Sequence, residues 1–187
     1  MRRFCVLNSS VLAAPDLKGY PYEVIPLEVV GVRMEMPSNN PIVLLRESTG
    51  DRYLPIWVGA VEATAIAYAQ QGIAPPRPLT HDLVKDLLTA LSAEVTLVTI
   101  TELRDGVFFA QMDLSNGEQV SARPSDAIAI ALRTNTPIVG AEAVLDEAGV
   151  EIPDPELTGD EAPEETVEKF REFLDQVTPE DFAGPGS

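Results

Sequence analysis

Two short segments of this chain place an arginine just before the start of a predicted helix. Residues 77–83 read RPLTHDL and residues 121–133 read SARPSDAIAIALR, so each has Arg-Pro, a hydroxyl residue, an aspartate and then an apolar helical pattern. Proline is tolerated in a first helical turn, and serine or threonine caps the amides there. A guanidinium beside such amides favours an anion. Arg77 and Arg123 are therefore candidates to bind phosphate, with structural salt bridges as the alternative.

The first of these segments contains the single histidine of the chain, His81. If Thr80 is the N-cap of a helix, His81 is the first helical residue, and the positive end of the helix favours its neutral imidazole. A neutral imidazole can act as a base or bind a metal. The alternative is a residue at a helix start that makes one hydrogen bond at a surface or a subunit contact.

Four carboxylates lie close to predicted helix starts. Asp82 and Asp86 are four residues apart and share a helical face, while Asp126 and Glu62 fall in first turns. Such oxygens suit a divalent cation, Mg²⁺ or Mn²⁺, which could bind a phosphate in turn. Alternatively, Asp82 pairs with Lys85 while Asp86 is solvated. In that case Asp126 and Glu62 complement the helix dipoles.

A serine nucleophile is disfavoured. Ser125 lies two residues after Arg123 and has no nucleophile-elbow pattern around it. We expect it to cap the helix or to contact a phosphate.

The charge of the chain limits how it could hold nucleic acid. The formal net charge is −17, and residues 151–187 carry 12 acidic and 2 basic residues. Residues 24–150 are also acidic, with 16 acidic and 8 basic residues. A non-specific binder gains affinity by neutralising many phosphates with lysine and arginine. The sequence therefore predicts a weak, local contact with nucleic acid rather than a long track.

Cysteine content and hydropathy predict the cellular compartment and the solubility of the protein. Cys5 is the only cysteine, which excludes an internal disulfide and favours the cytoplasm. No apolar run reaches the roughly 18 residues of a membrane span, so a soluble protein without a membrane partner is expected. The first 16 residues faintly resemble a secretory leader, but Asn8, Ser9 and Ser10 interrupt the apolar stretch.

The hydrophobic pattern predicts an α+β fold, because strands are followed by helices and then by strands again. It indicates strands at 27–36, 42–47, 52–58, 95–103, 107–114, 118–122 and 137–140, and helices at 59–71, 80–92, 126–134 and 141–148. The apolar stripe of the helix at 80–92 is expected to pack on the sheet. Trp57 lies in LPIWVG, which reads as a buried strand, so core packing or an oligomer contact is favoured over stacking on unpaired bases.

Four blocks, in order, carry a family resemblance. In chain order these blocks are DRYLPIWVG at 51–59, EATAIAYAQQG at 62–72, RPLTHDL at 77–83 and SARPSDAIAIALR at 121–133. Together they resemble the bifunctional nuclease family, over roughly residues 27–152. The resemblance implies a mixed, mainly antiparallel sheet with helices packed on it, a homo-oligomer, and activity on DNA and RNA. Residues 1–23 are then a disordered extension, 24–152 the nuclease-like domain, and 153–187 an acidic tail with an amphipathic helix at 168–175 that resembles actinobacterial members.

Two functions follow from these patterns. The first is a metal-assisted nuclease in which Arg77, Arg123 and Ser125 contact phosphate while His81 orients or deprotonates water. Its proposed metal ligands are Asp82 and Asp126, with Asp86 and Glu62 as further candidates. The second is a non-catalytic oligomeric module that binds a small anion or a protein partner. Convergence of His81, Asp82, Asp126 and both arginines on one cleft would favour the nuclease, and separation or mutual ion pairing would favour the module.

Overall fold

The computed structural model describes residues 22–35 and 38–151. It contains strands β1 (Val24–Glu35), β2 (Asn40–Glu47), β3 (Arg52–Trp57), β4 (Val95–Arg104), β5 (Val107–Leu114), β6 (Gln119–Ala122), β7 (Ile138–Ala141) and β8 (Val150–Glu151). Its helices are α1 (Ala60–Gln70), α2 (Thr80–Ala90), α3 (Pro124–Thr134) and α4 (Glu142–Ala148). The predicted N-terminal extension, Cys5 and the acidic tail with its helix lie outside the described residues.

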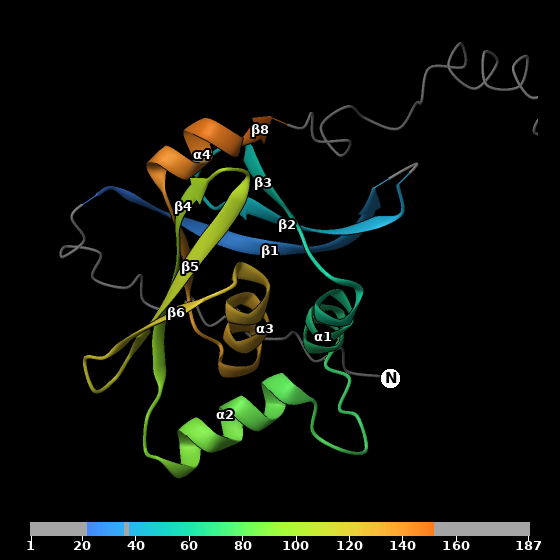
Figure 1. The fold of residues 1–187 in the computed structure, drawn as a ribbon, viewed down its shortest axis with the longest axis vertical. Helices are drawn as coiled ribbons and strands as arrows, with labels where there is room; N and C mark the ends of the chain where they lie inside the picture. The colour runs from blue at the N-terminus through green and yellow to red at the C-terminus, as the bar shows by residue number, and fades with distance from the viewer. Residues whose placement is uncertain (1–21, 36–37, 152–187) are drawn as a thin grey trace, which may run out of the picture. The chain divides into compact units, whose positions relative to one another are not determined.

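One mixed sheet organises the fold (Figure 1). Its strand order is β6-β5-β4-β7-β1-β2-β3-β8, and within the described residues only β4 and β7 pair in parallel. Two antiparallel meanders, β1-β2-β3 and β4-β5-β6, are thus joined through β7. The predicted α+β class with a mainly antiparallel sheet is confirmed. None of the helices in this part of the chain is long and apolar enough to cross a membrane.

Helices α1 and α3 pack against the sheet and against each other. Every residue of α3 from Ala127 to Ala131 is buried, because its alternating alanines and isoleucines present small and large side chains to neighbours on several sides. At β7, a Cβ on Gly140 would come within 2.8 Å of Leu145 and 3.0 Å of Leu27. Glycine at this position therefore lets α4 approach the sheet closely.

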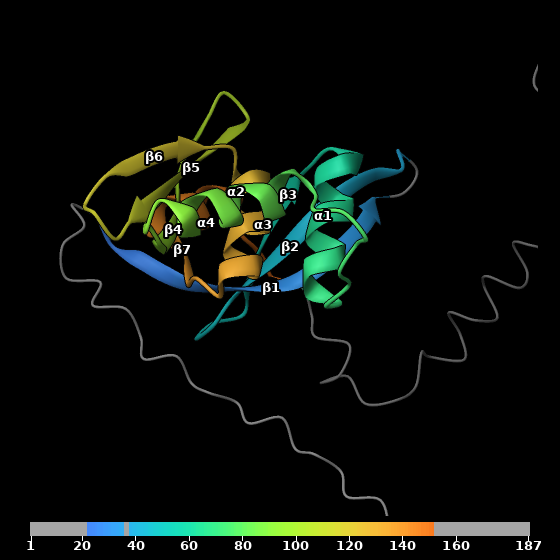
Figure 2. The same cartoon turned by 90° about the horizontal axis from the view of Figure 1, so that it is seen from below.

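The prediction that α2 packs on the sheet is wrong. Helix α2 packs on α3, and Figure 2 shows it as an outer layer over that helix. Val84 and Leu88 are partly buried against the core, whereas Leu83, Leu87 and Leu91 are exposed. The apolar stripe is wider than the surface that α3 offers, so three of its five residues stay exposed.

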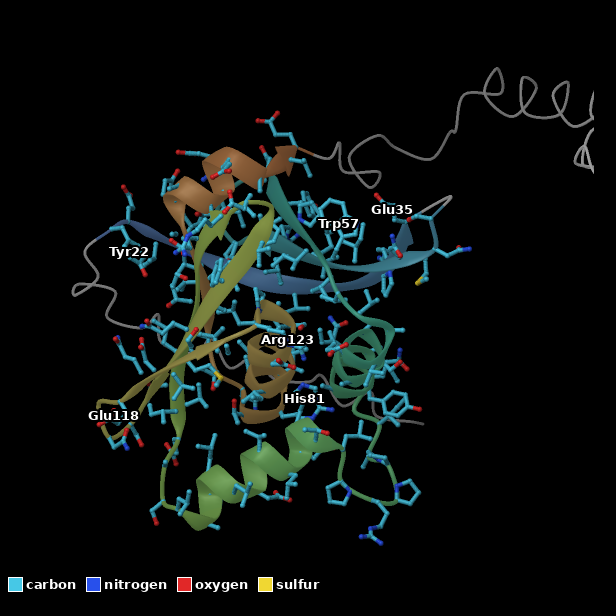
Figure 3. The ribbon with its side chains drawn as sticks, viewed as in Figure 1. Tyr22, Glu35, Trp57, His81, Glu118 and Arg123 are labelled. Carbon is cyan, nitrogen blue, oxygen red and sulfur yellow. The ribbon has the colours of Figure 1, made fainter. Side chains whose placement is uncertain are left out.

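Core packing of Trp57 is also contradicted. In β3 the alternation of strand side chains buries Leu54 and Ile56, which sends Trp57 to the opposite face. Trp57 is 54% exposed, and its Nε1 donates a hydrogen bond of 3.1 Å to Oε2 of Glu35 (Figure 3). An apolar run alone does not distinguish a strand covered on both faces from one covered on a single face.

Candidate active site at the starts of three helices

Arg123 lies at the N-cap of α3 and binds two carboxylates at once. Its Nε donates to Oδ2 of Asp126 at 2.8 Å, and its Nη2 donates to Oδ1 of Asp126 at 3.1 Å and to Oε1 of Glu62 at 2.8 Å. The side chain is nevertheless 66% exposed, and among the described residues its Nη1 makes no hydrogen bond. Arg123 is thus fixed on one side and keeps an exposed N–H donor group on the other.

Glu62 reaches Arg123 from the first turn of α1. Its carboxylate folds back over the helix start, where a Cβ on Gly59 would collide with Oε2 of Glu62. A hydrogen bond to its own backbone amide, followed by the one from Arg123, lowers the pKa of Glu62 below its ordinary value. The absent side chain at Gly59 therefore gives Glu62 the space to hold the arginine.

His81 joins this cluster through Asp126. It is the second residue of α2, only 8% exposed, and its Nε2 lies 3.1 Å from Oδ1 of Asp126. Figure 3 shows His81 and Arg123 where the starts of α2 and α3 come close to α1. Burial alone would raise the pKa of Asp126, but the hydrogen bonds from Arg123 and His81 outweigh it and the pKa is lowered.

The ionised Asp126 determines which ring nitrogen of a neutral His81 carries the proton. A carboxylate can only accept, so Nε2 of His81 carries the proton and the lone pair lies on Nδ1. His81 also lines a small pocket of about 310 Å³ together with Val61, Thr64 and Tyr68. Asp126 therefore fixes the orientation of the imidazole ring. We call Glu62, Arg123, Asp126 and His81 the arginine cluster.

Asp82 binds a different arginine, Arg133. One oxygen binds Nε of Arg133 on α3, and the other accepts the backbone N–H of Leu79 at 2.8 Å. Burial by itself raises the pKa of Asp82, but these two bonds outweigh it and the pKa is lowered. Leu79, rather than the predicted Thr80, is the N-cap, and Asp82 satisfies the amide there. Asp82 thus fastens α2 to α3.

Two further predicted residues stay outside the cluster. Arg77 and Asp86 are exposed, and neither forms an ion pair within the part of the chain that the structure describes. Asp86 borders a pocket of about 300 Å³ that also contains Asp82 and Arg133. The structure therefore brings together His81, Asp126, Arg123 and Glu62, but not Arg77, Asp82 or Asp86.

The four predicted metal ligands do not form one site in this arrangement. Within residues 22–35 and 38–151, no three histidine, cysteine, aspartate or glutamate side chains gather as a metal site. The carboxylates of Asp126 and Glu62 both bind Arg123, and that of Asp82 binds Arg133. A cation would have to displace the arginine before it could use both acids of the cluster.

A larger cavity opens beside Arg123. It measures about 520 Å³, and its lining includes Arg123, Ser125, Val107 and Phe108. Ser125 is only 7% exposed, and its hydroxyl makes no hydrogen bond among the described residues. The sequence pattern indicated Arg123 and Ser125, but it did not indicate the cavity, Arg133 or Gly59. The Gly59 to Glu62 spacing, typical of an N-cap and a third helical residue, was the available signal for Gly59.

Comparison with known proteins supports one family. The family model described as the bifunctional nuclease domain matches residues 43–153, which include every member of the arginine cluster. The chain belongs to the bifunctional nuclease domain family. An uncharacterized protein of Mycobacterium tuberculosis H37Rv is 54% identical to it over 158 residues, which cover 83% of this chain and 96% of that protein.

Plant relatives of this bifunctional nuclease domain are more distant. Bifunctional nuclease 1 of Oryza sativa subsp. japonica is 28% identical over 168 residues, covering 80% of this chain and 51% of the plant protein. Bifunctional nuclease 2 of Arabidopsis thaliana is 30% identical over 151 residues, covering 71% of this chain and 46% of the plant protein. The chain thus spans about half the length of these plant relatives.

Proposed function

We propose that this protein hydrolyses phosphodiester bonds of DNA or RNA at the arginine cluster. The observation that carries the proposal is the double role of Asp126, which binds Arg123 and His81 through the same oxygen, Oδ1. A group that can hold a phosphate and a group that can take a proton are thereby joined through one carboxylate oxygen. The plant relatives are named nucleases, which supports the same class of reaction.

In this proposal Arg123 and Ser125 bind the phosphate of the substrate. Nη1 of Arg123 binds a non-bridging phosphate oxygen, and the guanidinium offsets the charge that builds up in the transition state. The hydroxyl of Ser125, two residues further along, donates to a second phosphate oxygen. Glu62 and Asp126 keep the guanidinium in place, so that little reorganisation accompanies the reaction.

His81 supplies the proton acceptor. Its Nδ1 takes a proton from a water molecule while the water oxygen forms a bond to phosphorus. The bond between phosphorus and the leaving nucleoside oxygen breaks, and that oxygen is protonated from solvent. Asp126 stabilises the imidazolium that forms, since its carboxylate already accepts from Nε2.

The predicted divalent metal remains a separate proposal. Bound Mg²⁺ or Mn²⁺ would polarise a phosphate oxygen and lower the pKa of a bound water. The described carboxylates fit such an ion only after Arg123 has released them, so no step above depends on it. Cleavage that is lost in chelator and restored by Mg²⁺ or Mn²⁺ would support the metal. Cleavage unchanged in chelator would remove it from the proposal.

We further propose that the protein binds nucleic acid as its substrate, forms a homo-oligomer and acts in the cytoplasm. The acidic charge of the domain makes the contact with nucleic acid local, around Arg123. Leu83, Leu87 and Leu91, one helical turn apart and exposed on α2, offer an apolar face that a second copy could cover. Light scattering of the purified protein tests the oligomer: a monomeric mass would contradict it.

The alternative, a non-catalytic module, has one observation in its favour. Arg123 already binds two carboxylates, which is the mutual ion pairing expected of a structural or anion-binding group. The two functions are separated by incubating highly purified protein with labelled single-stranded DNA and RNA, with Mg²⁺, Mn²⁺ or chelator. Time-dependent cleavage that co-purifies with the protein supports the nuclease. Its absence under every condition supports the module.

A further inference from the structure

The cavity beside Arg123 lies where the sheet is incompletely paired. Within the described residues, β8 pairs with β3 only at Arg52 and Tyr53, and β6 pairs with β5 only from Ala110 to Asp113. The later part of β3 pairs there only with β2, and the first residues of β5 pair only with β4, so each strand is open on one side. Both edges line the cavity, although β3 and β5 are far apart in the strand order. The sheet is thus curved, and the cavity of about 520 Å³ occupies its open side.

The walls of this cavity are almost entirely apolar. The side chains along it come from β3, from the β4–β5 hairpin and from α4 to β8, and include Pro55, Leu103, Val107, Phe108, Ala148 and Val150. Its volume is in the usual range for small-molecule sites, about 300–1,000 Å³. An isolated phosphate or a backbone track needs no such walls. The cavity suits a flat or apolar group several atoms in size.

The charged end of the cavity is the start of α3. Arg123 and Ser125 line it there, and Nη1 of Arg123 makes no hydrogen bond to the described residues. Ser125 is more than nine-tenths buried, and its hydroxyl has no partner in the described part of the chain. Among the described residues the buried side-chain atom without a partner is Oγ1 of Thr99, so the Ser125 hydroxyl is not sealed off, and Ser125 lines the cavity. Two hydrogen-bond donors, Arg123 and Ser125, therefore lie at one end of an apolar cavity.

We infer that this cavity holds the base of an unpaired nucleotide whose phosphate binds Arg123 and Ser125. The faces of a nucleobase are apolar enough for these walls, and its attached phosphate matches the two donors. A base in a duplex is stacked and paired, so it could enter only by leaving the helix. This inference rests on the proposed function for the identity of the ligand, and it predicts preference for single strands.

Binding, rather than cleavage, tests the inference. Calorimetric titration of the full chain with adenosine 5′-monophosphate is compared with titration by ribose 5-phosphate, which lacks the base. We expect the nucleotide to bind about tenfold or more tightly than the sugar phosphate. Equal affinities would overturn the inference, because they would mean that the apolar walls contribute nothing.

Two matched variants locate the base. Val107 lines the cavity and Val120 does not, yet both are exposed strand valines, so replacement by glutamate is compatible with folding at either position. We expect Val107→Glu to weaken nucleotide binding about tenfold or more and Val120→Glu to leave it unchanged. Equal effects of the two substitutions, or no effect of Val107→Glu, would overturn the inference.

Cleavage measured in parallel separates the two proposals. Nucleotide binding that Val107→Glu abolishes, in a protein that cleaves nothing, would uphold the base cavity and overturn the nuclease. Cleavage of duplex and single strand at equal rates, unaffected by Val107→Glu, would uphold the nuclease and overturn the base cavity.

Discussion

His81 on α2 and Asp126 on α3 are 45 positions apart in the sequence, and Nε2 of the histidine lies 3.1 Å from Oδ1 of the aspartate. The contact joins the first turns of two helices that pack on each other. The position of the imidazole therefore depends on how α2 docks on α3, and Asp126 connects that docking to Arg123.

Replacement of the histidine tests its role as base. We expect His81→Ala to reduce the rate of phosphodiester cleavage by about 10²–10⁴, the usual contribution of a general base. Because His81 is buried, thermal unfolding must show that the variant is folded under the assay conditions. A folded His81→Ala protein that cleaves at the wild-type rate would show that another group takes the proton.

Asp82 is expected to act on stability. Asp82→Asn leaves the guanidinium of Arg133, which is 7% exposed, without its carboxylate, and should lower the free energy of unfolding by about 3 kcal/mol. Asp86→Asn, one turn further along the same helix, is the matched control and should change it by less than about 0.5 kcal/mol. Urea unfolding measures both. Unchanged stability of Asp82→Asn together with lost cleavage would instead assign Asp82 to the chemistry.

Acid should destabilise the domain. The pKa values of Asp126, Glu62 and Asp82 are all lowered in the folded state, so between the folded and unfolded values the unfolded chain binds more protons. Their contribution is complete above the unfolded values of about 4 and is lost as the pH falls through the folded ones. We expect the urea midpoint to decline below about pH 4, and less steeply in Asp126→Asn. A midpoint independent of pH in this range would contradict these ion pairs.

Gly59 and Glu62 should behave as one unit. A methyl group at position 59 collides with the Glu62 carboxylate, so Gly59→Ala should release Arg123 from Glu62, as Glu62→Gln does. We expect either substitution to slow cleavage by about tenfold and the double variant to be no slower than the single ones, because contacting residues couple. Multiplication of the two effects in the double variant would show that they act independently.

The part of the site that consists of residues close together in the sequence was predictable. Pro124, Ser125 and Asp126 follow Arg123 as a helix start, and the ion pair between Arg123 and Asp126 spans three residues of that start. Likewise, the alternation of apolar residues predicted the strands of the sheet, because a strand's pattern is set by which of its faces is buried.

The long-range half was not predictable. That Glu62 rather than Arg77 completes the cluster depends on how α1 and α3 pack, and RPLTHDL resembles the second motif without sharing its environment. The exposure of Trp57 and of the leucines on α2 likewise depends on which faces have neighbours. The cavity beside Arg123 depends on the curvature of a sheet whose two edges come from distant segments.

The most direct test of the arginine cluster is the rate at which Arg123→Ala cleaves a labelled single strand, relative to the wild type and to Arg46→Ala. Arg46 is also exposed and ion-paired, to Glu28 on the neighbouring strand, but it lies outside the cluster. We expect the rate to fall by about 10²–10³ in Arg123→Ala, the usual effect of removing one donor that stabilises transition-state charge, and to stay at the wild-type value in Arg46→Ala. A folded Arg123→Ala protein that cleaves as fast as Arg46→Ala would contradict this expectation.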